Sequence, residues 1–284
     1  MMKLRVLEEY LVKALMVLAC LIVAGSLVGV VAVMLVKGLP VLRLKMLVQV
    51  SQGGSSLGQE GGILNAILGS LCLGLGGTLG AILLALPIVS FLQRDYGGRT
   101  LFGKFTRLAL DVLWGIPSIV YGAFGFIIML YLGIRASLLG GIIALTLVEL
   151  PIMARGMDEV ARLVPMELKE ASYAVGSTRL EMTLKVTWRQ CLPGFVTAGL
   201  LAFGRGIGDA ASVLFTAGYS EFLPRSVMEP VASLPIAVYQ QYLSPFPEVQ
   251  QRAYVSATTL LIIVLLVSIL SRLSAARFAR HVVR

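Results

Sequence analysis

Arg205 and Asp209 are the residues of this sequence whose types and spacing most directly suggest chemistry. They stand four residues apart in an otherwise apolar stretch over residues 192–218, and this spacing places two side chains on one face of a helix. An ionisable side chain near the middle of a membrane span marks a substrate or ion pathway by default, and a guanidinium group binds oxyanions through paired hydrogen bonds. We therefore interpret Arg205 as lying on the path of an anion and as oriented by Asp209. The alternative is a buried Arg–Asp pair that is structural only.

The rest of the sequence lacks the patterns of catalytic and cofactor sites. The phosphate-loop pattern G-x-x-x-x-G-K-[S/T] is absent, and the glycines beside Arg205 follow no predicted strand. The three cysteines have no metal or disulfide spacing, the single histidine is His281 near the end of the sequence, and no nucleophile is paired with a base. The sequence therefore predicts a chain that is not an enzyme and that holds no cofactor and no metal.

The composition is that of an integral membrane protein. Of the 284 residues 57% are hydrophobic and 14% are charged, whereas soluble domains carry about 25% charged residues. Six stretches are long and apolar enough for helices of about 20 residues that cross a bilayer. The sequence thus predicts an all-α fold with six transmembrane helices in contact with lipid, over residues 14–36, 64–91, 108–132, 136–155, 192–218 and 253–275.

The distribution of basic residues predicts the orientation. With the first helix read as uncleaved and its N-terminus in the cytoplasm, 17 of the 24 Lys and Arg residues fall in inner segments and 6 in outer segments. Basic residues concentrate on the cytoplasmic side, so both termini are predicted to be cytoplasmic. The net charge of +9 is then a topology signal, and no basic soluble face predicts a nucleic acid partner.

The predicted organisation has three parts: residues 1–63 with one helix and an outer loop, a core over 64–275, and a cytoplasmic tail over 276–284. Gly76-x-x-x-Gly80 permits close helix contact, and Pro117 is expected to bend the third span. The acidic residues Asp111 and Glu149 are expected near inner helix ends, paired with cytoplasmic basic side chains.

Two loops carry local signals of structure. In the cytoplasmic loop over residues 156–191, the pattern predicts a helix from Met166 to Val175, a stop at Gly176, and a Thr178-x-x-Glu181 capping box that begins the next helix. The outer loop over residues 219–252 has five prolines, and a short helix is expected around 234–243.

The cytoplasmic loop resembles a known motif. Glu170-Ala171-Ser172-x-x-x-Gly176 is similar to the EAA loop of ABC-importer permeases, which forms the coupling helix that inserts into the ATPase subunit. The second half departs from that motif, because Trp188-Arg189 stand where the family has Leu-Pro, which follows here as Leu192-Pro193. The resemblance implies that Glu170, Ala171, Ser172 and Gly176 take part in coupling to an ATPase dimer.

Further segments resemble the phosphate-uptake permeases of the PstA type. These are the third-span region, residues 111–125, and the segment over 201–217 that carries Arg205 and has Asp209 where that family has Glu. The resemblance implies a MetI-like fold in a bacterial or archaeal inner (plasma) membrane. It also implies a second, homologous permease, an ABC ATPase dimer and an extracytoplasmic phosphate-binding protein as partners.

Three other functions remain open from the sequence. An ABC permease for sulfate, molybdate or phosphonate would share these motifs. A secondary anion carrier would show an internal repeat or matched broken helices, and no clear repeat is visible. A membrane-embedded enzyme would need paired carboxylates or a site with histidine at the interface, and neither is visible.

Overall fold

The chain is described by a computed structural model that covers the backbone of residues 2–50 and 61–278 and the side chains of 8–50 and 61–273. All regular structure in these ranges is helical. The elements are α1 (Met2–Gly38), α2 (Leu44–Val48), α3 (Leu64–Phe91), α4 (Leu101–Gly115), α5 (Ser118–Tyr131), α6 (Leu138–Arg162), α7 (Met166–Ala174), α8 (Arg179–Glu181), the π-helical η2 (Met182–Thr187), α9 (Trp188–Ile207), α10 (Val213–Thr216), α11 (Leu234–Tyr242) and α12 (Pro247–Phe278).

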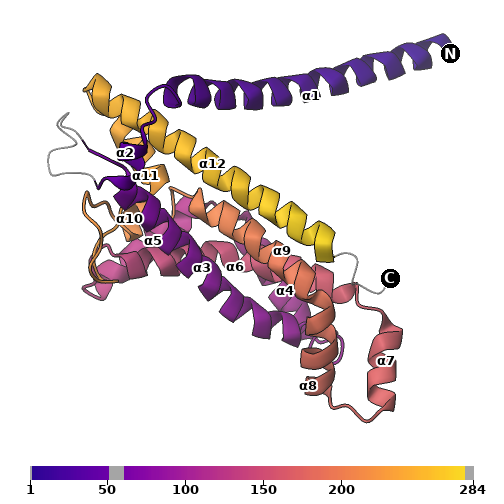
Figure 1. Cartoon of the computed structure of the whole chain (residues 1–284). Coiled ribbons are helices and arrows are strands. Elements are labelled where there is room, and N and C mark those ends of the chain that lie inside the picture. The colour runs from indigo at the N-terminus through magenta and orange to yellow at the C-terminus, as the bar shows by residue number, and fades with distance from the viewer. Residues whose placement is uncertain (1, 51–60, 279–284) are drawn as a thin grey trace.

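The body of the molecule is a bundle in which α3 packs chiefly on α6, α6 on α9, and α9 on α12 (Figure 1). Small residues allow the closest of these contacts. A Cβ atom at Gly76 would lie 2.7 Å from the side chain of Ile142, and one at Gly80 would overlap Thr146. Both neighbours belong to α6, so the close helix contact predicted from Gly76-x-x-x-Gly80 is confirmed.

Among the residues that the structure describes, four helices are long and apolar enough to cross a membrane, and a fifth crossing is counted if α4 and α5 form one broken span. The four are the Glu8–Gly38 part of α1, α3, α6 and the Pro247–Leu273 part of α12. The helix that carries Arg205, α9, is not among them. By length and composition the structure thus supports four or five of the six predicted spans.

The third predicted span, over residues 108–132, is not one continuous helix. The structure has α4 and α5 instead, meeting at 99°. Pro117 occupies the N-cap position of α5, since its ring cannot continue a preceding helix without a clash. The Tyr121 hydroxyl donates a 2.8 Å hydrogen bond to the Leu113 carbonyl near the end of α4. The same carbonyl also accepts from the Ile116 backbone N–H at 3.2 Å, so two donors hold the end of α4.

The predicted single helix over 192–218 is also wrong. The helix α9 begins earlier, at Trp188, and ends at Ile207, and the chain then forms the separate short helix α10. Gly208 is the C-cap residue of α9, so the chain leaves the helical path just before Asp209. Further along the chain, α11 agrees with the short helix expected around 234–243.

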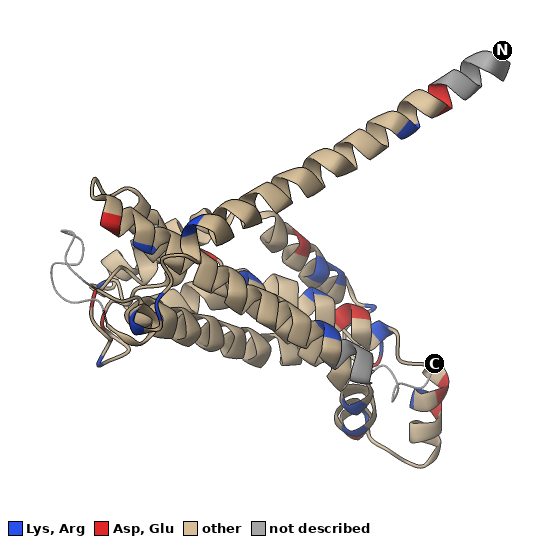
Figure 2. Ribbon diagram, turned by 45° about the horizontal axis from the view of Figure 1, so that its top comes forward, with Lys and Arg blue, Asp and Glu red and all other residues tan. Residues whose placement is uncertain are grey.

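The first helix lies apart from the bundle (Figures 1 and 2). It contacts α12 at its C-terminal end, where the Thr258 hydroxyl donates to the Met34 carbonyl at 2.9 Å and the Lys37 ammonium lies over the Tyr254 ring. The remainder of its described surface is mostly exposed and apolar. Such a surface is suited to lipid or to a second transmembrane protein.

Candidate functional site

Arg205 lies in the last turn of α9, facing a cavity of about 360 Å³. The cavity is bounded by the break between α4 and α5, by α6 and by α9. Its other walls are formed by Leu113, Trp114, Ile116, Ser118, Tyr121, Val148 and Ile152, so Arg205 is the one charged group among the lining side chains. The first residue of α5, Ser118, adds a hydroxyl and the positive end of that helix dipole.

Asp209 does not pair with Arg205, contrary to the prediction. Its carboxylate accepts hydrogen bonds from the Ser118 hydroxyl at 2.9 Å, from the Ser212 backbone N–H at 3.2 Å and from the Ser212 hydroxyl. Because α9 ends at Ile207, Asp209 has left the helical spacing that would have brought it beneath the arginine. Asp209 therefore joins the start of α5 to the start of α10.

Arg205 itself is exposed. Within the part of the chain that the structure describes, its guanidinium makes no ion pair and no side-chain hydrogen bond. The alternative interpretation of the sequence, a buried Arg–Asp pair with a structural role only, is therefore wrong. The arrangement leaves the donors of Arg205 available to a group that enters the cavity.

The loop over residues 156–191 forms the predicted helix, turn and second helix. The helix α7 ends at Ala174, and Gly176 then has a φ of +86°, a conformation that only glycine adopts without strain. Thr178 and Glu181 form the predicted capping box at the start of α8. The bond from the Thr178 backbone N–H, together with Lys185 at 3.0 Å, lowers the pKa of Glu181 to about 2. Figure 1 places α7 and α8 at one end of the bundle.

The two faces of α7 differ. Lys169 and Ser172 are buried, while Glu170, Ala171 and the following Gly176 are exposed. The Lys169 ammonium donates a 3.4 Å hydrogen bond to the side chain of Gln93 on the loop between α3 and α4. Of the four predicted coupling residues, three thus lie on the open surface, and Ser172 faces the protein instead.

Comparison with known proteins identifies the family. The pattern of the family described as "binding-protein-dependent transport system inner membrane component" matches residues 77–284. The chain belongs to this family. Among its relatives, the phosphate transport system permease protein PstA of Haemophilus influenzae is 32% identical over 240 residues, which are 84% of each chain. PstA 2 of Mycobacterium tuberculosis is 32% identical over 253 residues, 87% of this chain and 79% of the relative. The predicted PstA-type family and inner-membrane location are confirmed.

A solved structure shows the same fold as this permease. An inward-facing form of the MetNI methionine ABC transporter superposes with a TM-score of 0.61 at 19% identity, over 78% of this chain and 96% of that one. The predicted all-α, MetI-like permease fold is thereby confirmed.

Glu149 is a buried acid of the permease, and it does not lie near a helix end as predicted. Glu149 is fully buried and accepts a 2.7 Å hydrogen bond from the Thr78 hydroxyl on α3, so the expected pairing with a cytoplasmic base is wrong. The reason is that α6 runs to Arg162, beyond the predicted end at 155, which moves Glu149 to mid-helix. The other carboxylate oxygen lies against Gly206, where a Cβ atom would overlap it. Glu149 therefore fixes the spacing of α3, α6 and α9 next to Arg205.

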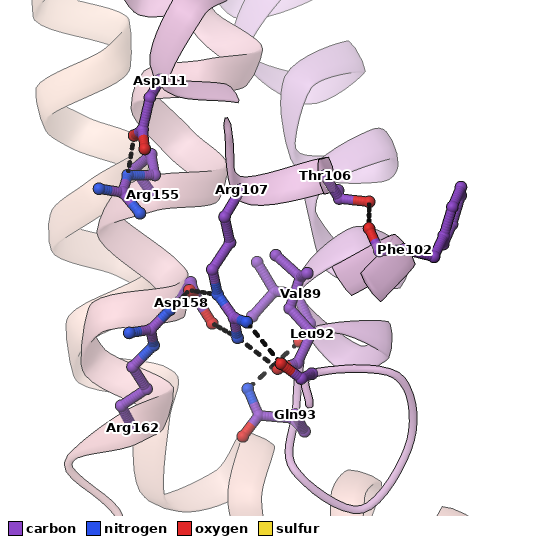
Figure 3. Close-up of polar contacts among 11 residues, drawn as sticks. Val89, Leu92, Gln93, Phe102, Thr106, Arg107, Asp111, Arg155, Asp158 and Arg162 are labelled. Atoms are coloured by element: carbon purple, nitrogen blue, oxygen red, sulfur yellow. Dashed lines mark hydrogen bonds and ion pairs between the residues drawn. The ribbon is translucent and has the colours of Figure 1, made fainter. Parts of the chain in front are cut away.

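The second acid near an inner helix end behaves as predicted. Asp111 on α4 forms an ion pair with Arg155 on α6, at 2.8 Å between Oδ1 and Nε (Figure 3). Both side chains are partly exposed, 45% and 25% respectively, so the pair contributes modestly to stability. It ties the inner part of the bent α4–α5 pair to α6.

Proposed function

We propose that this chain is the transmembrane permease subunit of an ATP-driven phosphate importer, and that Arg205 contacts the anion on its path. The observation that carries the proposal is an arginine that has no acidic partner among the described residues and that faces a cavity at the break between α4 and α5. The relatives named as phosphate transport permeases supply the substrate class. A planar guanidinium with unused donors is the side chain best suited to a tetrahedral oxyanion.

In this proposal six spans cross the membrane, formed by α1, α3, the α4–α5 pair, α6, α9 and α12, with both termini cytoplasmic. The asymmetry of 17 inner to 6 outer basic residues supports that orientation. Residues 64–275 form the transport core and 156–191 its coupling loop, while 1–63 and 276–284 flank it. Charged and irregular positions inside a membrane are tolerated where they line such a cavity.

Asp209 has a supporting role in the proposed path. Its carboxylate holds the Ser118 hydroxyl at 2.9 Å, which fixes the start of α5 at the wall of the cavity. It accepts three hydrogen bonds from neutral donors and forms no ion pair with Arg205 among the described residues.

The exposed face of α7 is the proposed contact with an ATPase subunit. Glu170 and Ala171 present a small, open surface, and the turn at Gly176 gives the helix a sharp end. Closure of an ATPase dimer would move this helix together with that of a second, homologous permease. An extracytoplasmic phosphate-binding protein would deliver the substrate, and ATP hydrolysis would take place in the partner subunits.

Uptake of labelled phosphate by cells with and without the gene tests the proposal, with excess unlabelled sulfate or molybdate as competitors. Loss of uptake on deletion, with no effect of either competitor, is the expected result. Uptake that persists after deletion, or that either competitor abolishes, would overturn the phosphate assignment. Co-purification of an ATPase with the chain would distinguish an ABC permease from a secondary carrier.

A further inference from the structure

A second cavity, of about 390 Å³, opens at the other functional end of the molecule, between the end of α3, the start of α4, the end of α6 and α7. We call it the basic pocket, because five of its lining side chains are cationic: Arg94, Arg99, Arg107, Arg162 and Lys169. Neither the transport path nor the coupling contact proposed above makes use of it.

Part of this charge is fixed in place by hydrogen bonds (Figure 3). Arg107 donates to the Leu92 carbonyl at 2.6 Å, to the Gly98 carbonyl at 2.8 Å and to Asp158 at 3.0 Å. Arg162 donates to the same Asp158 carboxylate at 2.7 Å. Asp158 is only 1% exposed, so one buried acid anchors two arginines whose other faces border the pocket.

The remaining charge is less compensated. Arg94 and Arg99 are exposed on the loop between α3 and α4, and neither forms an ion pair within the described residues. The buried Lys169 ammonium has Asp95 at 3.8 Å. Five cations thus stand against two acids, Asp95 and Asp158. A pocket with this excess attracts an anionic group such as a phosphate ester.

Apolar side chains beside the pocket indicate where that anion comes from. The first turns of α4, directly after Arg99, expose Leu101, Phe102 and Phe105. Phe102 also meets the ring of Phe91 at the end of α3, edge to face, with centroids 5.5 Å apart. Both α3 and α6 are candidate spans that end here, which puts the pocket at the depth of lipid headgroups. A soluble anion would gain nothing from this apolar surface, whereas acyl chains would cover it.

We propose that the basic pocket binds the phosphate group of an anionic phospholipid of the cytoplasmic leaflet, with its acyl chains along α4. Basic pockets between transmembrane helices on the cytoplasmic side recognise such headgroups. Because the loop between α3 and α4 also holds Lys169 of α7 through Gln93, a bound lipid would brace the loop that supports the coupling helix. The proposal does not depend on which substrate the permease carries.

The test is native mass spectrometry of the purified full-length chain in detergent, titrated with phosphatidylglycerol or with zwitterionic phosphatidylcholine. The wild type is expected to retain phosphatidylglycerol selectively. Substitution R94Q together with R99Q removes two exposed charges without breaking an ion pair. It should weaken retention about thirtyfold, since each basic side chain near an anionic lipid surface contributes about fivefold. The matched control, R189Q with R272Q, removes two exposed arginines outside the pocket and should leave retention unchanged.

Three outcomes would overturn the proposal. Equal retention by the R94Q/R99Q variant and the wild type would show that the pocket is not the lipid site. Displacement of the lipid by inorganic phosphate at similar affinity would assign the pocket to a free anion. Loss of ATPase co-purification in this variant, with lipid retention unchanged, would assign the surface to the partner protein.

Discussion

Arg107 lies against the loop between α3 and α4, and Arg205 lies beside the break between α4 and α5, yet their surroundings are opposite. Arg107 is 20% exposed and its guanidinium donates to two carbonyls and to the buried Asp158. Arg205 is exposed, faces a cavity, and has no acidic partner among the described residues. An arginine that is held by several fixed acceptors locks helices together. An arginine whose donors are unused is available to a ligand. We therefore assign a structural role to Arg107 and a transport role to Arg205.

The largest expected effect on stability comes from removing the acid that holds Arg107 and Arg162. Substitution D158N removes the charge that two arginines share, and we expect a loss of about 3 kcal/mol in the free energy of unfolding, because hydrogen bonds to a charged group contribute about 1.5–3 kcal/mol each and two arginines lose such a partner. The thermal midpoint of the purified protein in detergent measures it. The neighbouring exposed Glu159 provides the control E159Q. Similar midpoints for D158N and E159Q would remove the distinction between the two arginines.

Packing next to Arg205 should show the second largest effect. A methyl group at Gly206 would overlap the Glu149 carboxylate, so G206A should cost about 1–3 kcal/mol by overpacking and should displace Arg205. The control is G204A, since a Cβ atom there would lie 3.9 Å from Val267, an ordinary contact. Thermal midpoints and phosphate uptake of the two variants check this. Equal behaviour would mean that Glu149 does not fix the position of α9.

A bulky side chain on the exposed face of α7 should weaken binding of the ATPase subunit without lowering the stability of the chain. We expect A171W to lower the affinity for the ATPase subunit at least about tenfold, because a buried contact between small residues does not accommodate an indole. A pull-down with the ATPase measures it, and the exposed Leu265 of α12 supplies the control L265W. Unchanged recovery of the complex with A171W would count against α7 as the coupling helix.

The smallest effect is expected at the capping box. Substitution T178A removes the side chain that accepts from the Glu181 amide at 3.3 Å and should cost about 1 kcal/mol locally, seen as faster hydrogen exchange of that amide. The pKa of Glu181 is lowered from 4.5 to about 2, so its part of the cap is fully present above pH 4.5. That stabilisation is lost as the pH falls toward 2. Exchange that is unchanged in T178A would contradict the cap.

The sequence predicted what short-range physics decides. Gly176 and the Thr178–Glu181 box were identified because a left-handed turn and a helix cap each depend on residues within a few positions. The contact surface at Gly76 and Gly80 was identified because only small residues let two helices approach closely. Each of these features has the predicted form in the structure.

The sequence did not predict the features that depend on tertiary packing. Pro117 predicted a bend, but its 99° angle depends on how α4 and α5 pack on the rest of the bundle. The end of α9 at Ile207 separated Asp209 from Arg205, and apolarity alone gave no sign of that break in a glycine-rich run. Glu149 was misplaced because its partner Thr78 is 71 residues away in sequence, and no local pattern records such a contact.

The central claim is that Arg205 contacts the transported anion, and uptake of labelled phosphate by the R205Q variant tests it most directly. The account predicts a loss of about 10- to 100-fold, the value of one hydrogen-bonded contact to a charged group, with the assembled complex recovered at wild-type levels. R205K should retain intermediate uptake because it keeps the charge without the planar fork. R135Q, which replaces an exposed arginine outside the cavity, is the matched control. Normal uptake by assembled R205Q would contradict the account.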